Sequence, residues 1–150
     1  MNLIVGATGM LGGEICRLLA EQGSAVRVLV RESSNPEKVD RLRSIGAEVV
    51  RGNLKDRASL ETACRGASAV VSTASSTVSR QSGDSIESVD RQGQLNLIEA
   101  AEKAGVKHFI LISFPIVDIE FPLQTAKRAA EDRLRRGRMT YTIRQAELST

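Results

Sequence analysis

The sequence has few of the residues that build zinc sites, disulfide frameworks and histidine-dependent catalytic centres. Its 150 residues include no tryptophan, one tyrosine, one histidine and two cysteines. Cys16 and Cys64 are not clustered and cannot supply a zinc site or a disulfide framework, so we expect reduced thiols and no metal site. His108 has no acidic or metal-binding partner within its motif, so we interpret it as structural rather than as a general base.

Long runs of one charge sign and long apolar runs are also absent. The formal net charge is +3, with lysine and arginine scattered among aspartate and glutamate, so no segment resembles a nucleic-acid-binding arm. Arginines do gather between Arg133 and Arg138, but Glu131 and Asp132 dilute their charge and no aromatic residue for base stacking lies beside them. No apolar run could span a bilayer, and no targeting segment precedes the first apolar run. We therefore expect a cytoplasmic protein that binds neither nucleic acid nor membrane.

The sequence does contain a regular alternation of short β-branched runs and helix-like stretches. Apolar residues at helical spacing, such as Leu11, Ile15, Leu18 and Leu19, predict a first helix that Gly23 ends. This alternation predicts a doubly wound parallel sheet of the Rossmann type, an α/β fold that occupies residues 1–150 as one domain. The predicted strands are Leu3–Val5, Ala25–Val30, Glu48–Val50, Ala69–Val71, Phe109–Ile112 and Met139–Ile143. The later helices are predicted at Pro36–Ile45, Arg57–Cys64, Ser85–Ala104 and Leu123–Arg136, with Asn96 near the ligand end.

A glycine-rich turn follows the first predicted strand and opens the first predicted helix. Gly6 permits a tight turn, Gly9 allows the backbone to approach a pyrophosphate, and Gly12 allows the helix to pack closely on the strand. The helix N-terminus would direct its unpaired N–H groups at the phosphates. The alternative is a turn that only packs, but its place between strand and helix favours dinucleotide binding. A P-loop is excluded because no Gly-Lys-Ser/Thr ending is present. The predicted contacts in this turn are Gly6, Thr8, Gly9, Met10, Leu11 and Gly12.

The end of the second predicted strand indicates which dinucleotide is preferred. NAD-binding folds place an acidic side chain there, on the ribose 2′-hydroxyl, whereas this sequence has Arg31. A guanidinium pairs with a 2′-phosphate and a carboxylate repels it, so the sequence favours NADP. Ser33 and Ser34 could add hydroxyl groups. Glu32 is the opposing feature, because NAD would be favoured if Glu32 pointed inward, and Arg31 could instead be a solvated charge at the strand end.

Five segments together resemble the NmrA-like branch of the atypical short-chain dehydrogenases and reductases. They are GATGMLG, VLVR, GAEVVRGNLKD, NLIEAAEKAGVKHFILIS and AKRAAEDRL, and they cover nearly the whole chain. The resemblance implies that Asn53, in place of the usual aspartate, lies at the adenine edge and that Leu54 packs against the ring. It also implies that Thr73, Ala74 and Ser75 lie under the ribose and pyrophosphate.

The resemblance also identifies missing catalytic residues. Catalytic members pair a tyrosine with a lysine four residues later, but here Leu123 stands at the tyrosine position and only Lys127 is present. Ser113 is followed by Phe114 and Pro115, where active relatives have further hydroxyl groups. We therefore expect Lys127 to be the only candidate catalytic residue, in contact with the nicotinamide ribose. The alternative is a solvated lysine.

Two functions remain open from the sequence. The first is an NADPH-dependent oxidoreductase or isomerase that uses Lys127. The second is a redox-sensing regulator that binds NADP, with NAD as the alternative cofactor, and interacts with a protein partner or forms a homo-oligomer. Because the given sequence stops at Thr150, we expect most of the family's substrate lobe to be absent from it, either through truncation or because a partner provides that lobe. Without a lid, binding without turnover is at least as strong an expectation as turnover.

Overall fold

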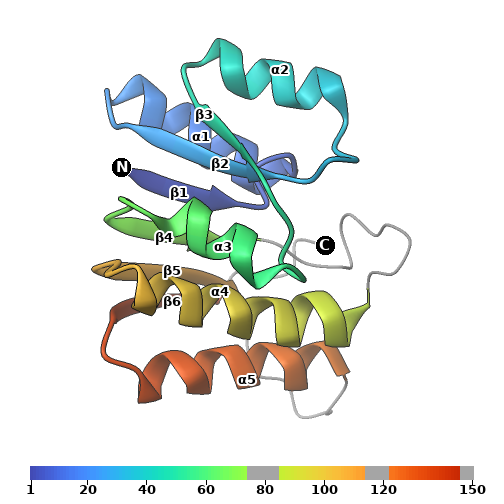
Figure 1. Ribbon diagram of the computed structural model, residues 1–150, viewed down its shortest axis with the longest axis vertical. Coiled ribbons are helices and arrows are strands. Elements are labelled where there is room, and N and C mark those ends of the chain that lie inside the picture. The colour runs from blue at the N-terminus through green and yellow to red at the C-terminus, as the bar shows by residue number, and fades with distance from the viewer. Residues whose placement is uncertain (74–84, 114–121, 146–150) are drawn as a thin grey trace.

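A parallel β-sheet forms the centre of the computed structural model, which describes residues 1–73, 85–113 and 122–145 except the side chains of residues 86, 122, 123 and 145. The sheet has six strands in the order β3-β2-β1-β4-β5-β6, and every neighbouring pair is parallel (Figure 1). This is the doubly wound Rossmann arrangement that the alternating sequence pattern predicts. The strands are β1 (Asn2–Val5), β2 (Val26–Val30), β3 (Glu48–Arg51), β4 (Ala69–Ser72), β5 (His108–Ser113) and β6 (Thr140–Gln145).

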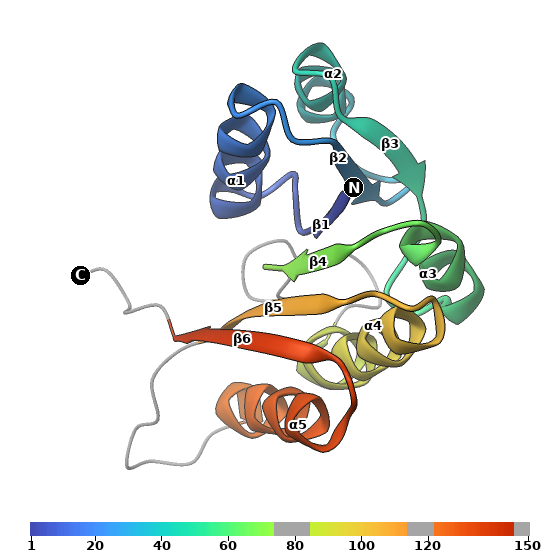
Figure 2. The same ribbon diagram turned by 90° about the vertical axis from the view of Figure 1, so that its left-hand side faces the viewer.

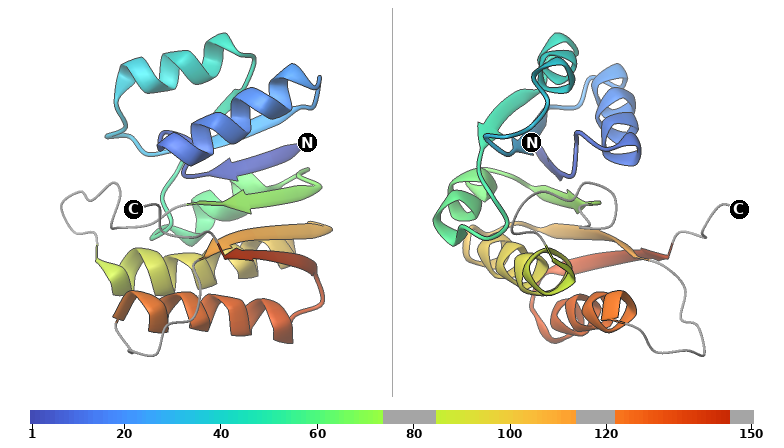
Figure 3. Two further views of the ribbon diagram at one scale, coloured as in Figure 1. Left: turned by 180° about the vertical axis from the view of Figure 1, so that it is seen from behind. Right: turned by 90° about the vertical axis from the view of Figure 1, so that its right-hand side faces the viewer.

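Helices cover both faces of the sheet (Figure 2). The helices are α1 (Met10–Glu21), α2 (Pro36–Ser44), α3 (Arg57–Cys64), α4 (Gln92–Lys103) and α5 (Pro122–Arg136). Helices α3, α4 and α5 lie in front of the sheet in Figure 1, and the reverse view in Figure 3 places α1 in front of β1 and β2. Local sequence fixes several helix starts: the side chain of Asn35 caps α2 ahead of Pro36, and the side chain of Asp56 caps α3.

The predicted fourth helix begins differently from the expectation. Residues Ile86–Arg91 form a π-helical turn, η1, and α4 begins at Gln92. Ser85 and Ser88 form a reciprocal capping box, and the backbone N–H of Gln92 donates to the carbonyl oxygen of Glu87, five residues earlier. Apolar periodicity carries no signal for this wider turn, so the sequence predicted one continuous helix.

Alternating residues along the strands divide the core between the two faces. Leu3 and Val5 of β1 pack with α3, α4 and α5, whereas Ile4 packs with α1 and α2. Phe109 and Leu111 of β5 join the first of these clusters. This alternation follows from the two-residue period of a strand. In a doubly wound sheet, a ligand binds at the carboxyl ends of the strands where the strand order reverses. Here that place is the carboxyl ends of β1 and β4.

No helix in the described part of the chain is long and apolar enough to cross a membrane.

Candidate cofactor-binding site

A cavity of about 520 Å³ lies at the carboxyl ends of the central strands. The glycine turn after β1, the loop after β2, the segment after β3, the end of β4 and η1 all contribute to its wall. Ala74 and Ser75 lie outside the described residues, and Lys127 is not part of the cavity's described lining. The other residues that the sequence predicted for the cofactor do line it: Gly6, Thr8, Gly9, Met10, Leu11, Gly12, Arg31, Asn53, Leu54 and Thr73.

The glycine turn is held by its own backbone. Gly6 has a φ of 90°, a value that side-chain-bearing residues rarely adopt, and the N–H of Gly9 donates to the carbonyl oxygen of Gly6 at 3.1 Å. A Cβ atom on Gly12 would lie 2.2 Å from that same oxygen, so only glycine allows α1 to approach the turn this closely. Thr73 reinforces the turn from β4, because its hydroxyl donates to the carbonyl oxygens of Val5 and Gly6 at 3.1 and 3.3 Å.

The N-terminus of α1 faces this cavity without a side-chain cap. Gly9 is the N-cap residue, no side chain accepts a hydrogen bond from the first N–H groups, and the first turn carries no acidic residue. Unpaired N–H groups at a helix start attract anions through their partial positive charge. Together with the glycine turn, they fit the pyrophosphate of a dinucleotide.

The loop after β2 presents Arg31 and Ser34 to the cavity. Two hydrogen bonds join these residues: the N–H of Arg31 donates to the Ser34 side-chain Oγ, and the N–H of Ser34 donates to the Arg31 carbonyl oxygen, both at 3.0 Å. Glu32 is exposed and does not belong to the cavity lining. Arg51, which no sequence motif indicated, donates from Nη1 to the Arg31 carbonyl oxygen at 3.0 Å.

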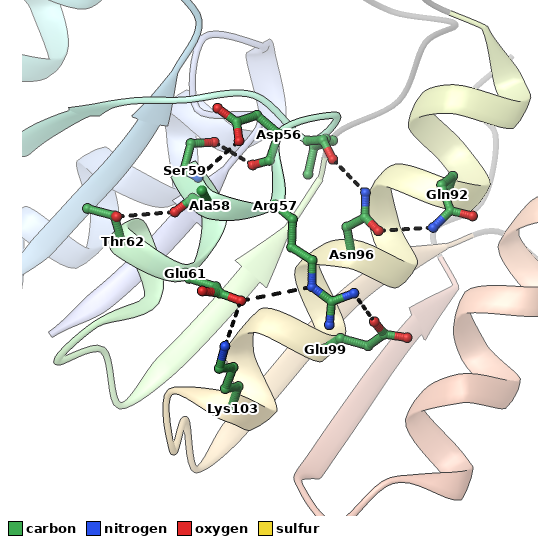
Figure 4. A network of polar contacts seen from close by, with 11 residues as sticks. Asp56, Arg57, Ala58, Ser59, Glu61, Thr62, Gln92, Asn96, Glu99 and Lys103 are labelled. Carbon is green, nitrogen blue, oxygen red and sulfur yellow. Dashed lines mark hydrogen bonds and ion pairs between the residues drawn. The ribbon is translucent and has the colours of Figure 1, made fainter.

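The segment after β3 places Asn53 and Leu54 at the cavity through contacts with α3 and α4. Ser59 accepts a hydrogen bond from the Asn53 N–H at 3.0 Å. Asn96, labelled on α4 in Figure 4, donates from Nδ2 to the Leu54 carbonyl oxygen at 3.1 Å. A Cβ atom on Gly93 would lie 2.9 Å from the Leu54 Cβ, so α4 packs tightly against this segment. Asn96 therefore supports the ligand end from α4 through the backbone of Leu54.

Lys127 lies on α5 in a buried polar region that α5 shares with η1. Its side chain is 5% exposed, and its Nζ lies 3.6 Å from Oδ1 of the fully buried Asp90. Burial lowers the pKa of Lys127 below its ordinary value, while the carboxylates of Asp90 and Glu131 oppose that shift. We use the name buried polar region for the described buried polar side chains, which lie on β4, η1, α4, β5 and α5: Ser72, Asp90, Gln94, Ser113, Gln124, Lys127 and Glu131.

The two strand-end serines are engaged within that same region. Ser72 donates from Oγ to Gln94 Oε1 at 2.8 Å, and Ser113 donates from Oγ to Glu131 Oε2 at 3.0 Å. Glu131 also pairs with Arg128, and with Arg135 at 3.5 Å. The Ser113 hydroxyl is thus directed at a buried carboxylate on α5. Phe114 and Pro115 lie outside the described residues.

The remaining polar candidates lie away from the cavity. His108 is the first residue of β5, at the amino end of the parallel strands, and its ring nitrogens lie 2.8 Å from the hydroxyls of Thr140 and Thr142. Cys16 and Cys64 are buried free thiols, and burial raises the pKa of each to about 11. No group of three or more histidine, cysteine, aspartate or glutamate side chains within the described ranges could hold a metal ion.

Comparisons with known proteins agree with this geometry. The sequence profile of the NAD(P)H-binding family matches residues 6–147. Photosystem II assembly factor Ycf39 of Synechocystis sp. is 36% identical over 149 residues, which cover 95% of this chain and 43% of that protein. The chain thus spans less than half the length of curated relatives such as this one.

Solved structures show the same fold. A putative NAD-dependent epimerase/dehydratase from Bacillus halodurans has a TM-score of 0.81 at 29% identity, covering 98% of this chain and 70% of that one. The triphenylmethane reductase of Citrobacter sp., solved in complex with NADP(H), has a TM-score of 0.74 at 25% identity, covering 95% and 48%. The chain therefore belongs to the NAD(P)H-binding family, a Rossmann-fold group of the atypical short-chain dehydrogenase/reductase type that the NmrA-like resemblance indicates.

Proposed function

We propose that residues 1–150 act as one cofactor-binding domain that prefers NADP(H) over NAD(H). The observation that carries the preference is the orientation of the loop after β2, where Arg31 and Ser34 line the cavity and the exposed Glu32 does not. A guanidinium in that place attracts the 2′-phosphate of NADP, and an inward carboxylate would have repelled it.

Each part of the cavity wall has a proposed role in holding the dinucleotide. The N–H groups at the start of α1 bind the pyrophosphate, and Gly12 allows them to come close. Asn53 and Leu54 contact the adenine, and Thr73 supports the turn beneath the ribose. Ala74 and Ser75 remain proposed contacts from the sequence. When bound, the nicotinamide would supply or accept a hydride, whereas these residues bind and orient the cofactor.

We further propose that this domain acts through cofactor occupancy rather than through proton transfer by Lys127. Two observations support this proposal: Lys127 is buried beside Asp90 and lies outside the described cavity lining, and the Ser113 hydroxyl is directed at Glu131. A relative bearing the name of an assembly factor fits a regulatory role, in which a protein partner responds to the bound nucleotide. A reductase remains the second candidate, because a solved neighbour is a reductase complexed with NADP(H).

Cofactor titration tests the binding proposal. We expect NADPH to bind the chain more tightly than NADH by calorimetry, and Arg31→Ala to remove most of the difference by lowering NADPH affinity roughly tenfold to a hundredfold. Glu32→Ala is the matched control, because it removes the neighbouring charge outside the cavity and leaves the preference unchanged. Equal affinities for NADPH and NADH in the unmodified chain would contradict the proposed selectivity.

Turnover distinguishes the two candidate functions. We expect no substrate-dependent NADPH oxidation across a panel of carbonyl compounds and quinones. The regulatory role predicts that NADP changes the affinity for a protein partner, and by reciprocity that the partner changes the affinity for NADP. Oxidation that requires a panel compound and disappears in a folded Lys127→Met variant would support the reductase instead.

A further inference from the structure

Arg51 stands beside the nucleotide-selective part of the cavity. It is the last residue of β3, in register with Val30, and it directly precedes the cavity-lining Gly52 without belonging to the described lining itself. Its Nη1 donates to the Arg31 carbonyl oxygen at 3.0 Å. The sequence places these two arginines far apart, and the parallel pairing of β2 with β3 brings them together.

Among the residues that the structure describes, no carboxylate neutralises the charge of Arg51. No carboxylate in the described ranges forms an ion pair with it, whereas many other arginines of this chain pair with glutamate or aspartate. The side chain is exposed, and the single bond to the Arg31 carbonyl uses only part of the donor capacity of a guanidinium. A cation with further donor capacity therefore lies one hydrogen bond away from the backbone of Arg31.

We propose that Arg51 is the second arginine of the 2′-phosphate site, an inference that rests on the proposed binding of NADP(H) in this cavity. One N–H group of Arg51 holds the loop after β2 through the Arg31 carbonyl, and the remaining donors face a phosphate bound by Arg31. A phosphate monoester carries about −1.5 to −2 charge at neutral pH, so a second guanidinium matches it better than one alone. NAD carries a hydroxyl in place of the 2′-phosphate, so Arg51 should add little to its affinity.

Two nucleotide fragments isolate the 2′-phosphate from the rest of the cofactor. 2′,5′-ADP carries this phosphate and 5′-AMP lacks it, and neither fragment contains the nicotinamide. We expect Arg51→Gln in the full chain to weaken 2′,5′-ADP binding about tenfold while changing 5′-AMP binding less than about twofold, as for the removal of a hydrogen bond to a charged group. Arg51→Lys retains the charge without the planar pair of N–H donors of a guanidinium, so it should lose only part of the affinity for 2′,5′-ADP.

A matched control separates the local effect from a general loss of positive charge. Arg138 is an exposed arginine just ahead of β6, at the opposite edge of the sheet, and Arg138→Gln should leave both fragment affinities unchanged. The affinity of the unmodified chain for 2′,5′-ADP should also fall more steeply with salt than that of Arg51→Gln, because the variant has one charge fewer at the site.

The possible results separate this inference from the function on which it rests. Equal losses for both fragments in Arg51→Gln would assign Arg51 a purely structural role and overturn the inference. Unchanged affinities would overturn it as well. If the unmodified chain binds neither fragment, or binds both equally, the proposed NADP site is wrong. The inference about Arg51 is then wrong as well, because it rests on that site.

Discussion

The nucleotide cavity and the buried polar region around Lys127 use polar groups in opposite ways. The uncapped N-terminus of α1 and the residue Arg31 line an open volume. In the buried region, ionisable side chains meet one another instead, with Lys127 beside Asp90 and Glu131 beside Arg128 and Arg135. The first region presents an uncapped helix N-terminus to a ligand, whereas the second joins β4 to α4, β5 to α5 and η1 to α5.

A family motif that local geometry requires is stronger evidence of a site than a single residue shared with the family. Local geometry requires glycine at two positions of the turn, because Gly6 has a φ of 90° and a Cβ atom on Gly12 would lie 2.2 Å from the Gly6 carbonyl oxygen. A lysine has no such geometric requirement, and its function depends on what surrounds it. Here Lys127 is buried beside Asp90, and its contact with the nicotinamide ribose stays a prediction. Substitutions in each region test this difference between the cavity and the buried polar region.

Breaking the buried pair should cost the most stability. Removing one member of a buried ion pair leaves the other without its partner and costs about 3–5 kcal/mol. We expect Asp90→Asn and Lys127→Met each to lower the free energy of unfolding by about that amount, measured by urea denaturation. The double variant should recover much of the loss, giving a coupling energy in a double-mutant cycle.

The same variants test whether Lys127 serves the fold or the cofactor. If Lys127→Met leaves the free energy of unfolding unchanged but weakens NADPH binding, Lys127 acts on the cofactor and the contrast between the two regions is wrong. The recovery in the double variant is the control, because replacing Asp90 as well would not restore a cofactor interaction that depends on Lys127.

Adding a side chain where α1 meets the glycine turn should weaken cofactor binding, with a smaller loss of stability than breaking the buried pair. Gly12→Ala introduces a Cβ atom 2.2 Å from the Gly6 carbonyl oxygen, so α1 must move away from the turn. We expect a loss of about 1–3 kcal/mol in the free energy of unfolding, as for overpacking, and a weakening of NADPH binding by at least about tenfold.

Gly13 offers a matched control on the same helix. A Cβ atom there would lie 3.3 Å from the Ala7 carbonyl oxygen, a contact that a small shift relieves. Gly13→Ala should therefore change stability by no more than about 1 kcal/mol, with the better helix propensity of alanine as an opposing gain. Equal NADPH affinities for the two variants would show that α1 need not approach the turn closely.

The smallest expected effect is a pH dependence of stability that arises from Lys127. Its pKa is lower in the folded chain than the ordinary 10.5, because burial disfavours the charged form. Between the folded-state pKa and 10.5, the unfolded chain binds more protons, so the contribution of Lys127 to stability rises as the pH rises. The slope is at most about 1.4 kcal/mol per pH unit.

This slope can be isolated by comparison with the double variant Asp90→Asn/Lys127→Met. Cys16 and Cys64 act in the opposite direction, because their pKa values are raised from 9.0 to about 11 and stability falls as the pH rises through that interval. Both proteins retain the cysteines, so the difference between their urea unfolding curves cancels this contribution. A difference that is constant or falls as the pH approaches 10.5 would show that Lys127 is not held in a desolvated site.

The sequence predicted the parts of the structure that local rules control. The order of strands and helices followed from apolar periodicity, and the structure adds side-chain caps from Asn35 and Asp56 at the starts of α2 and α3. The π-helical turn was not predicted, because the choice between four- and five-residue hydrogen bonds depends on how η1 packs against its neighbours. The sequence also left open whether Arg31 or Glu32 lines the cavity, because the directions of neighbouring residues in a loop follow no fixed period.

By itself, therefore, the sequence determined a doubly wound sheet and a glycine turn built for a dinucleotide, because glycine conformations and apolar spacing act over a few residues. Tertiary structure alone decided that Lys127 lies beside Asp90, that Ser113 donates to Glu131 and that Arg51 reaches the backbone of Arg31. Each of these contacts joins residues from separate elements. Burial and charge then set their chemistry, and both depend on which elements the fold brings together.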